Sequence, residues 1–278
     1  MLSAVFDEDI GMQSINVRWF LSVVGNWLII ALTMLAAAVS HHWAVYLIAI
    51  FVIGTRQHAV GILGHDGAHW HVSKVKWVND AMTSLLCLWP MGIGLHGYRK
   101  FHFTHHRTVG TEDDPELVHK RRFSDKWHTN TNKLKLFTTD LIGFGWREVL
   151  FILKVARPQR PIDVIGPVLT IGFLVALLLW LGYGQLVVLW YVALYTSFWA
   201  VFRLRAYTEH VGTESTHRLE KPSLWRRWVY LPANTWLHWE HHRWPAVPTW
   251  RLPKQNEKTP DLSGLAADRP SPPSNSSV

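Results

Sequence analysis

Long apolar stretches alternate with short polar breaks along this chain of 278 residues. Four stretches, at about 20–40, 43–61, 162–181 and 185–202, carry almost no charge. Each is close to the roughly 20 residues that a helix needs to cross a bilayer. Only a few residues separate the first stretch from the second and the third from the fourth. The pattern therefore predicts an all-α membrane protein with four transmembrane helices in two hairpins.

The charge distribution predicts how these helices are oriented. The net charge is +8, and the short breaks contain no Lys or Arg. Nearly all Lys and Arg lie at about 65–160 and after residue 202. Because Lys and Arg accumulate on cytoplasmic loops, we expect both termini and the polar loops in the cytoplasm, at the inner membrane if the cell is bacterial. The basic residues share no amphipathic face, so they do not indicate nucleic-acid binding.

Three further segments need separate interpretations. Residues 81–97 are apolar but contain Pro90, Gly92 and Gly94, and we expect an interfacial or re-entrant segment. Residues 136–155 are amphipathic and are expected on the membrane surface. Residues 254–278 are rich in Pro and Ser, which predicts a disordered cytoplasmic tail after one membrane domain at 1–253.

Composition directs attention to histidine. The single cysteine, Cys87, excludes a disulfide scaffold, a cysteine-ligated iron–sulfur cluster and a cysteine zinc finger within this chain. Of 17 histidines, eight lie in three clusters: HDGAH at 65–69, HFTHH at 102–106 and HWEHH at 238–242. Residues three or four apart share a helix face, so each cluster directs two imidazoles to one point. The third imidazole of an HxxHH cluster can reach a neighbouring metal.

A ninth candidate, His210, follows the fourth apolar stretch near the same predicted interface. Nine imidazoles are too many for one metal ion and suit two. Zinc normally takes four ligands, whereas imidazole also suits iron, copper and nickel. A nitrogen-rich pair of irons that binds O₂ is the most economical interpretation. The candidate ligands are His65, His69, His102, His105, His106, His210, His238, His241 and His242.

These motifs resemble the membrane fatty acid desaturase superfamily, which includes carotenoid ketolases and related hydroxylases. Flanking phrases are similar too: GHD at 64–66, HHR at 105–107 before EDDP at 112–115, and HRWPAVP at 242–248. The resemblance covers about residues 40–253. It implies that a cytoplasmic helical cap carries the histidine boxes, and that the nine histidines bind two iron ions.

The resemblance also has consequences for the reaction. It implies O₂ as co-substrate and oxidation of an unactivated C–H bond in a lipid-like substrate. We expect a separate electron donor, either a ferredoxin or a b-type cytochrome with its reductase. Some relatives hold a water ligand with an Asn one helical turn before the residue that matches His210; Ala206 stands there in this chain.

Polar residues around the boxes are candidates for supporting roles. Ring nitrogens that do not face a metal usually bind a carboxylate or a carbonyl. Asp66, Glu209 and Glu240 are placed for this role, with Asp113 or Asp114 as a further candidate. In the second apolar stretch, Arg56 and His58 either line a polar cavity or, for Arg56, extend to the membrane interface. His96 is interpreted as a structural histidine.

Three functions fit these observations. The favoured one is a fatty acid or acyl-lipid desaturase. A ketolase or hydroxylase acting on a carotenoid or another hydrocarbon chain is the alternative within enzymes. A non-catalytic membrane metal-binding or transport protein is the alternative of another class, and it predicts ligands along a path inside the spans. The clusters are instead expected at the cytoplasmic helix ends, which favours an enzyme.

Overall fold

The computed structural model describes residues 15–116, 132–210 and 216–257, and the regular structure in this part is helical. Four helices are long and apolar enough to cross a membrane: α1 (Val17–Ser40), α2 (Trp43–Ala68), α8 (Ile162–Trp180) and the continuous helix Gly184–His210. The last comprises α9 (Gly184–Ala193), the π-turn η4 (Leu194–Phe198) and α10 (Trp199–His210). The predicted number of apolar helices is confirmed.

The second and fourth helices continue beyond their predicted ends at 61 and 202, to Ala68 and His210. Their polar ends are surrounded by protein. Thr55, Gln57 and Asp66 of α2 are completely buried. A helix end that packs against other helices does not have to stop where its sequence becomes polar.

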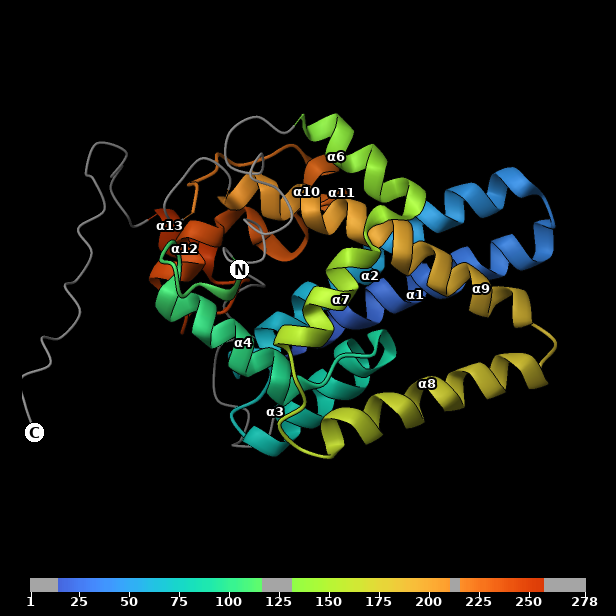
Figure 1. Cartoon of the computed structure of the whole chain (residues 1–278), viewed down its shortest axis with the longest axis horizontal. Coiled ribbons are helices and arrows are strands. Elements are labelled where there is room, and N and C mark those ends of the chain that lie inside the picture. Colours follow the sequence, from blue (N-terminus) through green and yellow to red (C-terminus); the bar gives the residue numbers. More distant parts are fainter. Residues whose placement is uncertain (1–14, 117–131, 211–215, 258–278) are drawn as a thin grey trace, which may run out of the picture.

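The connecting turns and the histidine-bearing helices lie at opposite ends of the molecule (Figure 1). The α1–α2 turn and the α8–α9 turn lie at one end. The other end holds α4 (Leu95–Thr108), α12 (His238–Arg243) and α13 (Leu252–Glu257). α1, α9 and η4 all pack against α2, so α2 occupies the centre of the bundle.

The segment 81–97 does not form one continuous spanning helix. It contains the end of α3 (Lys76–Thr83), the π-turn η1 (Ser84–Leu88) and the short helix η2 (Trp89–Met91). The chain then turns at Gly92, whose φ of 79° is easily adopted only by glycine, and α4 begins at Leu95. This arrangement brings His65 and His102 together, with ring centroids 4.4 Å apart, as the interfacial or re-entrant interpretation requires.

The amphipathic segment 136–155 is divided. α6 (Lys133–Thr139) leads into η3 (Asp140–Phe144), and α7 (Trp146–Val155) follows a break at Gly143, whose φ is 99°. The polar position Asp140 is fully buried, and its Oδ1 accepts a hydrogen bond from Arg203 Nη1 at 2.7 Å. A location on the membrane surface stays a prediction.

Two sequence interpretations change at the edges of the fold. α13 extends to Glu257, so residues 254–257 of the predicted tail are helical, and residues 258–278 lie outside the described part. Arg56 does not line the cavity described below. It is buried, donates to Asn26 Oδ1 at 3.2 Å and to the carbonyl of Trp228, and lies 3.9 Å from the centre of the Trp228 ring. It therefore attaches α11 (Leu224–Val229) to α1 and α2.

Candidate metal centre

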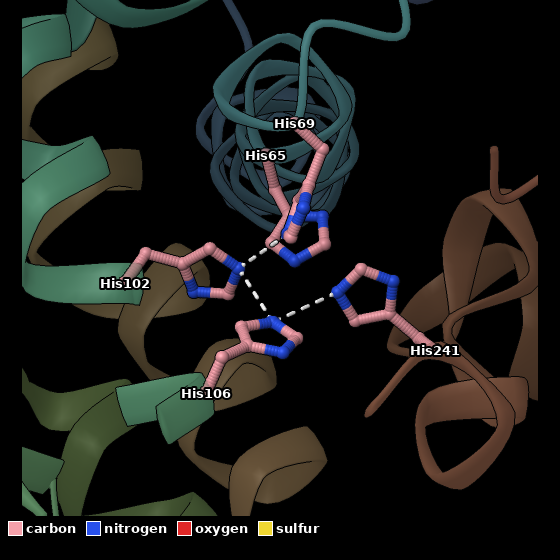
Figure 2. A group of neighbouring side chains, drawn as sticks. All are labelled: His65, His69, His102, His106 and His241. Carbon is pink, nitrogen blue, oxygen red and sulfur yellow. Dashed lines mark hydrogen bonds between the residues drawn. The ribbon is translucent and has the colours of Figure 1, made fainter. Parts of the chain in front are cut away.

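The nine predicted ligands come together in two groups. In each group the ring nitrogens lie within 4.8 Å of one another. The first group, shown in Figure 2, contains His65, His69, His102, His106 and His241. The second contains His105, His210, His238 and His242.

In the first group, five rings from three elements converge on one point (Figure 2). The Nε2 atoms of His69 and His106 lie 2.8 and 2.9 Å from His102 Nε2. His241 Nε2 lies 3.1 Å from His106 Nε2. The buried Nε2 of His65 has no hydrogen-bond partner among the described residues. Convergent ring nitrogens form a donor set that fits a metal ion with a preference for imidazole, such as iron, copper or zinc.

The second group lies beside the first, because α4 and α12 contribute to both. His238 Nε2 is 3.1 Å from His210 Nε2 and 3.1 Å from His242 Nε2. The rings of His106 and His242, which belong to different groups, stack at 4.3 Å. Each HxxHH box thus directs its i, i+4 pair to one group and the remaining histidine to the other, as the helical spacing predicts.

Burial keeps these imidazoles neutral. It lowers the pKa of His69 to about 2 and that of His106 to about 4, and neighbouring rings add to the effect. The pKa values of His102, His238 and His241 fall well below 6.5 for the same reasons. Metal binding needs a deprotonated ring nitrogen, so at neutral pH these side chains are already in the form that binds a metal.

One carboxylate orients a ring of the second group, and another lies close to a second ring. Asp114 Oδ1 lies 2.9 Å from His105 Nδ1, which leaves Nε2 to face the metal position. The structure thus selects Asp114 from the two predicted alternatives. Glu209 Oε2 lies 3.7 Å from His238 Nε2, and Arg205 Nε donates to the other oxygen at 2.7 Å. Arg205 was not predicted, although its i, i+4 spacing from Glu209 was a readable signal.

The other two predicted carboxylates hold the framework around the histidines. Asp66 Oδ2 accepts from Thr249 Oγ1 at 2.7 Å, and its Oδ1 lies 3.7 Å from His71 Nδ1. Glu240 Oε1 accepts from Arg218 Nε at 3.0 Å. Each of these carboxylates is adjacent in sequence to a candidate ligand. Side chains at adjacent helix positions point about 100° apart, so the carboxylate does not face the same point as the ligand.

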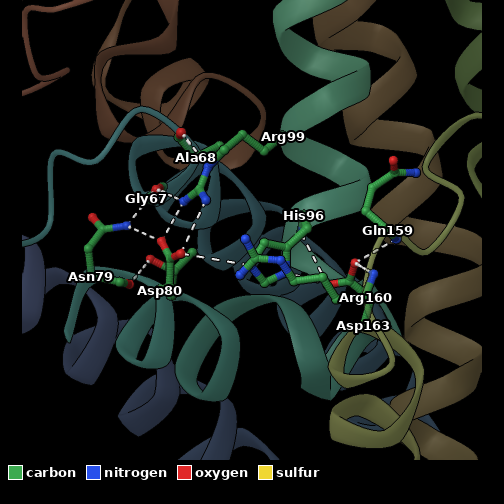
Figure 3. A network of polar contacts seen from close by, with 10 residues as sticks. Gly67, Ala68, Asn79, Asp80, His96, Arg99, Gln159, Arg160 and Asp163 are labelled. Atoms are coloured by element: carbon green, nitrogen blue, oxygen red, sulfur yellow. Dashed lines mark hydrogen bonds and ion pairs between the residues drawn. The ribbon is translucent and has the colours of Figure 1, made fainter. Parts of the chain in front are cut away.

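A polar network fixes the end of α2 relative to α4 (Figure 3). Arg99 Nε donates to the carbonyl of Ala68 at 3.0 Å, and Nη2 donates to the carbonyl of Gly67 at 3.2 Å. Both terminal nitrogens also donate to Asp80, at 2.6 and 3.2 Å. Asn79 Nδ2 donates to the same Gly67 carbonyl at 2.8 Å. Arg99 precedes His102 by one helical turn, so it connects the first histidine box to the second.

The network continues to the beginning of α8. His96 Nδ1 lies 2.8 Å from Asp163 Oδ1, and His96 Nε2 lies 3.9 Å from Asp80 (Figure 3). The sequence interpretation of His96 as a structural histidine agrees with these contacts. Arg99 was not predicted, because its partners include main-chain carbonyls that no motif reveals. Asp80 was not predicted, because its partner Arg99 lies 19 positions farther along the chain.

A cavity of about 210 Å³ adjoins both histidine groups. At one end its wall includes His65, His102 and His210. Apolar side chains of α2, α4, α7, η2 and η4 form much of the remaining wall, which also includes Glu116, Arg203, Arg205 and Glu209. Candidate ligands and an apolar space large enough for part of a hydrocarbon chain are therefore contiguous.

Four apolar helices, two polyhistidine groups and an adjoining cavity define a class: a protein with four potential membrane-spanning helices and a candidate two-metal centre beside a largely apolar cavity. Comparison with known proteins gives the family. A fatty acid desaturase family model matches residues 41–266. The chain belongs to this family.

Individual relatives agree with this assignment. The chain is 36% identical over 89 residues to an sn-1 acyl-lipid omega-3 desaturase (ferredoxin) of Nostoc sp. (strain 36), covering 32% of this chain and 24% of the relative. It is 37% identical over 84 residues to a probable fatty acid desaturase of Sorghum bicolor, covering 30% and 21%. It is 24% identical over 249 residues to a sphingolipid delta(4)-desaturase of Drosophila melanogaster, covering 86% and 73%. The first two matches span less than a quarter of those relatives.

Proposed function

We propose that this protein is an O₂-dependent di-iron oxidoreductase that acts on C–H bonds of a lipid chain, as a fatty acid or acyl-lipid desaturase. One observation carries the proposal: two neighbouring all-histidine groups face the same apolar cavity. Membership of the desaturase family supports it.

The ligand set supports two iron ions. His65, His69, His102, His106 and His241 would hold one ion, and His105, His210, His238 and His242 the other. Bound iron supplies the O₂ activation that breaking an unactivated C–H bond requires. A single zinc site would leave about half of these buried imidazoles without a role.

The protein's own part in the reaction is to position the substrate and exclude water. The cavity wall places a hydrocarbon chain beside both groups, and its aromatic and aliphatic side chains keep solvent away from the reacting carbon. Asp114 holds the His105 ring in one orientation. Arg205 keeps the Glu209 carboxylate directed toward His238.

We further propose that the histidine groups face the cytoplasm. They lie at the end of the bundle opposite the two helix turns, which contain no Lys or Arg (Figure 1). Electrons would then come from a separate cytoplasmic carrier. A ferredoxin or a b-type cytochrome with its reductase fits this role, and the name of the Nostoc relative specifies ferredoxin.

The test compares lipid extracts from cells that express the protein together with a reductase. We expect a product that has lost two hydrogen atoms relative to its precursor. The double variant His105→Ala, His106→Ala removes one ligand from each group and should lower the product by at least roughly 100-fold, more than loss of an outer-shell partner. His41→Asn, at the exposed α1–α2 turn, is the matched control and should retain full activity.

Other outcomes separate the alternatives. A product that has gained oxygen would identify a hydroxylase or ketolase and retain the metal centre. Purified protein that binds no iron would contradict the proposal. Translocation of metal without any lipid product would identify a transport protein instead.

A further inference from the structure

The cavity extends away from the metal position along α2. Its wall includes His65 at one end and His58, Gly61 and Ile62 farther along the same helix. Seven residues separate His58 from His65, which corresponds to about 10 Å along the helix axis. His58 therefore stands beside the part of a bound chain that is remote from the reacting carbon.

His58 is a polar side chain whose ring neighbours in the cavity wall are phenylalanines. It is 1% exposed, and neither ring nitrogen has a hydrogen-bond partner among the described residues. Phe198 and Phe202 lie edge-on to its ring at 6.3 and 6.0 Å. A phenylalanine or leucine would pack here without the free-energy cost of burying an unpaired polar group.

A second unpartnered donor lies in the same region of the wall. Trp199 Nε1 is buried and has no hydrogen-bond partner within the described part of the chain. The Trp199 ring contacts both Phe198 and Phe202, at 5.0 and 5.4 Å. His58 and Trp199 thus contact the same pair of phenylalanines, and both line the cavity.

The charged side chains nearby do not share this property. Arg203 donates to Asp140 at 2.7 Å, and Arg205 donates to Glu209 at 2.7 Å. His58 and Trp199 add the hydrogen-bonding capacity of neutral ring nitrogens to this wall. A neutral imidazole offers one donor and one acceptor, and an indole offers one donor. This combination matches an uncharged oxygen group, such as a hydroxyl or a carbonyl.

We propose that His58 and Trp199 form a subsite that binds a hydroxyl or carbonyl oxygen on the lipid chain, at about 10 Å along α2 from the metal centre. The proposal rests on the function proposed above and makes it more specific, because the preferred substrate is then an oxygen-bearing chain. A hydroxyl can accept from Trp199 Nε1 and donate to the acceptor nitrogen of His58, and a carbonyl can accept from both rings.

The test measures which chains the metal-loaded, full-length protein retains. The purified protein is incubated with an equimolar mixture of octadecanoic acid and its hydroxy and oxo positional isomers, and the bound chains are quantified by mass spectrometry. We expect enrichment of one narrow range of oxygen positions over octadecanoic acid, by about fivefold for one neutral hydrogen bond. Equal retention of all the chains overturns the proposal, and so does retention of no oxygen-bearing isomer.

Variants connect that preference to the two side chains. His58→Phe should abolish the enrichment and retain octadecanoic acid, and Trp199→Phe should reduce the enrichment. His58→Gln keeps a donor and an acceptor and should preserve part of it, which also covers the case in which His58→Phe does not fold. Enrichment that persists in folded His58→Phe overturns the proposal. Bound iron and product formation, measured in parallel, test the proposed function separately, so the two failures are distinguishable.

Discussion

The helices α2 and α8 are both apolar enough to cross a membrane, yet their surroundings differ sharply. In the most apolar part of α2, 67% of residues are buried inside the protein, against 17% in α8. α8 presents Leu169 and Phe173 outward, each 66% exposed, as a helix in contact with lipid would. α2 carries the completely buried Gln57 and Asp66. An apolar run indicates a spanning helix, and the polar residues within it indicate which helix lies at the centre.

Acidification should produce the largest difference in local stability between the histidine-bearing end of α2 and α8. The folded protein lowers the pKa of His69 to about 2 and that of His106 to about 4, so below pH 6.5 the unfolded chain binds more protons than the folded chain. Each such group removes up to about 1.4 kcal/mol of stability per pH unit between its unfolded and folded pKa. Stability of the metal-free protein is therefore full above pH 6.5 and falls progressively between pH 6.5 and 4.

Thermal unfolding of the metal-free protein across this pH range measures the loss, and hydrogen exchange locates it. Amides of α4 and α12 should lose protection while those of α8, which contains no histidine, keep it. The metal-loaded protein is the control, because bound metal competes with protons and should move the loss to lower pH. Uniform loss of protection in α4 and α8 would contradict the expected difference.

A pair of glycine substitutions should give the next largest difference between α2 and α8, measured as the change in the free energy of unfolding. A methyl group at Gly67 in α2 would overlap the side chain of Thr83, which is held by a 2.6 Å hydrogen bond to Asn79. Gly67→Ala should therefore lower the free energy of unfolding by about 3 kcal/mol, the upper part of the range for overpacking. A methyl group at Gly172 in α8 meets no atom within 4 Å. Gly172→Ala should be neutral or stabilising by less than about 1 kcal/mol.

Denaturation midpoints of the two variants and the parent protein, measured in the same detergent, test this pair. Similar losses in both would show that α8 is covered by a neighbour at Gly172, and no loss in either would show that α2 has space at Gly67.

The smallest effect is expected from Arg99→Lys. A lysine keeps the positive charge, but its point charge cannot bind two carbonyls and Asp80 in the fork geometry of arginine. The end of α2 would then be held less firmly, and affinity for metal should fall by about tenfold. Titration of the metal-free protein with Co²⁺, followed by its absorption spectrum, measures this change.

Lys100→Arg, at the exposed neighbouring position on α4, is the control. A purely structural role for Arg99 predicts a lower unfolding midpoint with unchanged metal affinity, and that result would remove Arg99 from the group of positioning residues.

The histidine boxes were accessible from sequence because helical periodicity alone determines which imidazoles share a face. The separation of His105 from His102 and His106 follows directly from that spacing. Asp66 shows the limit of such reasoning. Its predicted role came from its neighbour His65, whereas its hydrogen bond is with Thr249, which lies 183 positions farther along the chain.

Arg56 shows the same limit for long side chains. Sequence reasoning weighed a cavity wall against the membrane interface, and the observed partner is the carbonyl of Trp228, 172 positions away. A sequence motif cannot predict a main-chain acceptor, because every residue has a carbonyl and only the fold determines which carbonyl is near.

The last histidine box has a consequence for biosynthesis. α12 supplies His241 to the first group and His238 and His242 to the second, so both groups lack ligands until the final box has emerged from the ribosome. Proteins are made from the amino terminus, and a nascent chain that already holds α2 and α4 therefore presents an incomplete set of ligands. The complete set of ligands for either proposed metal ion therefore exists only after the last box has been made.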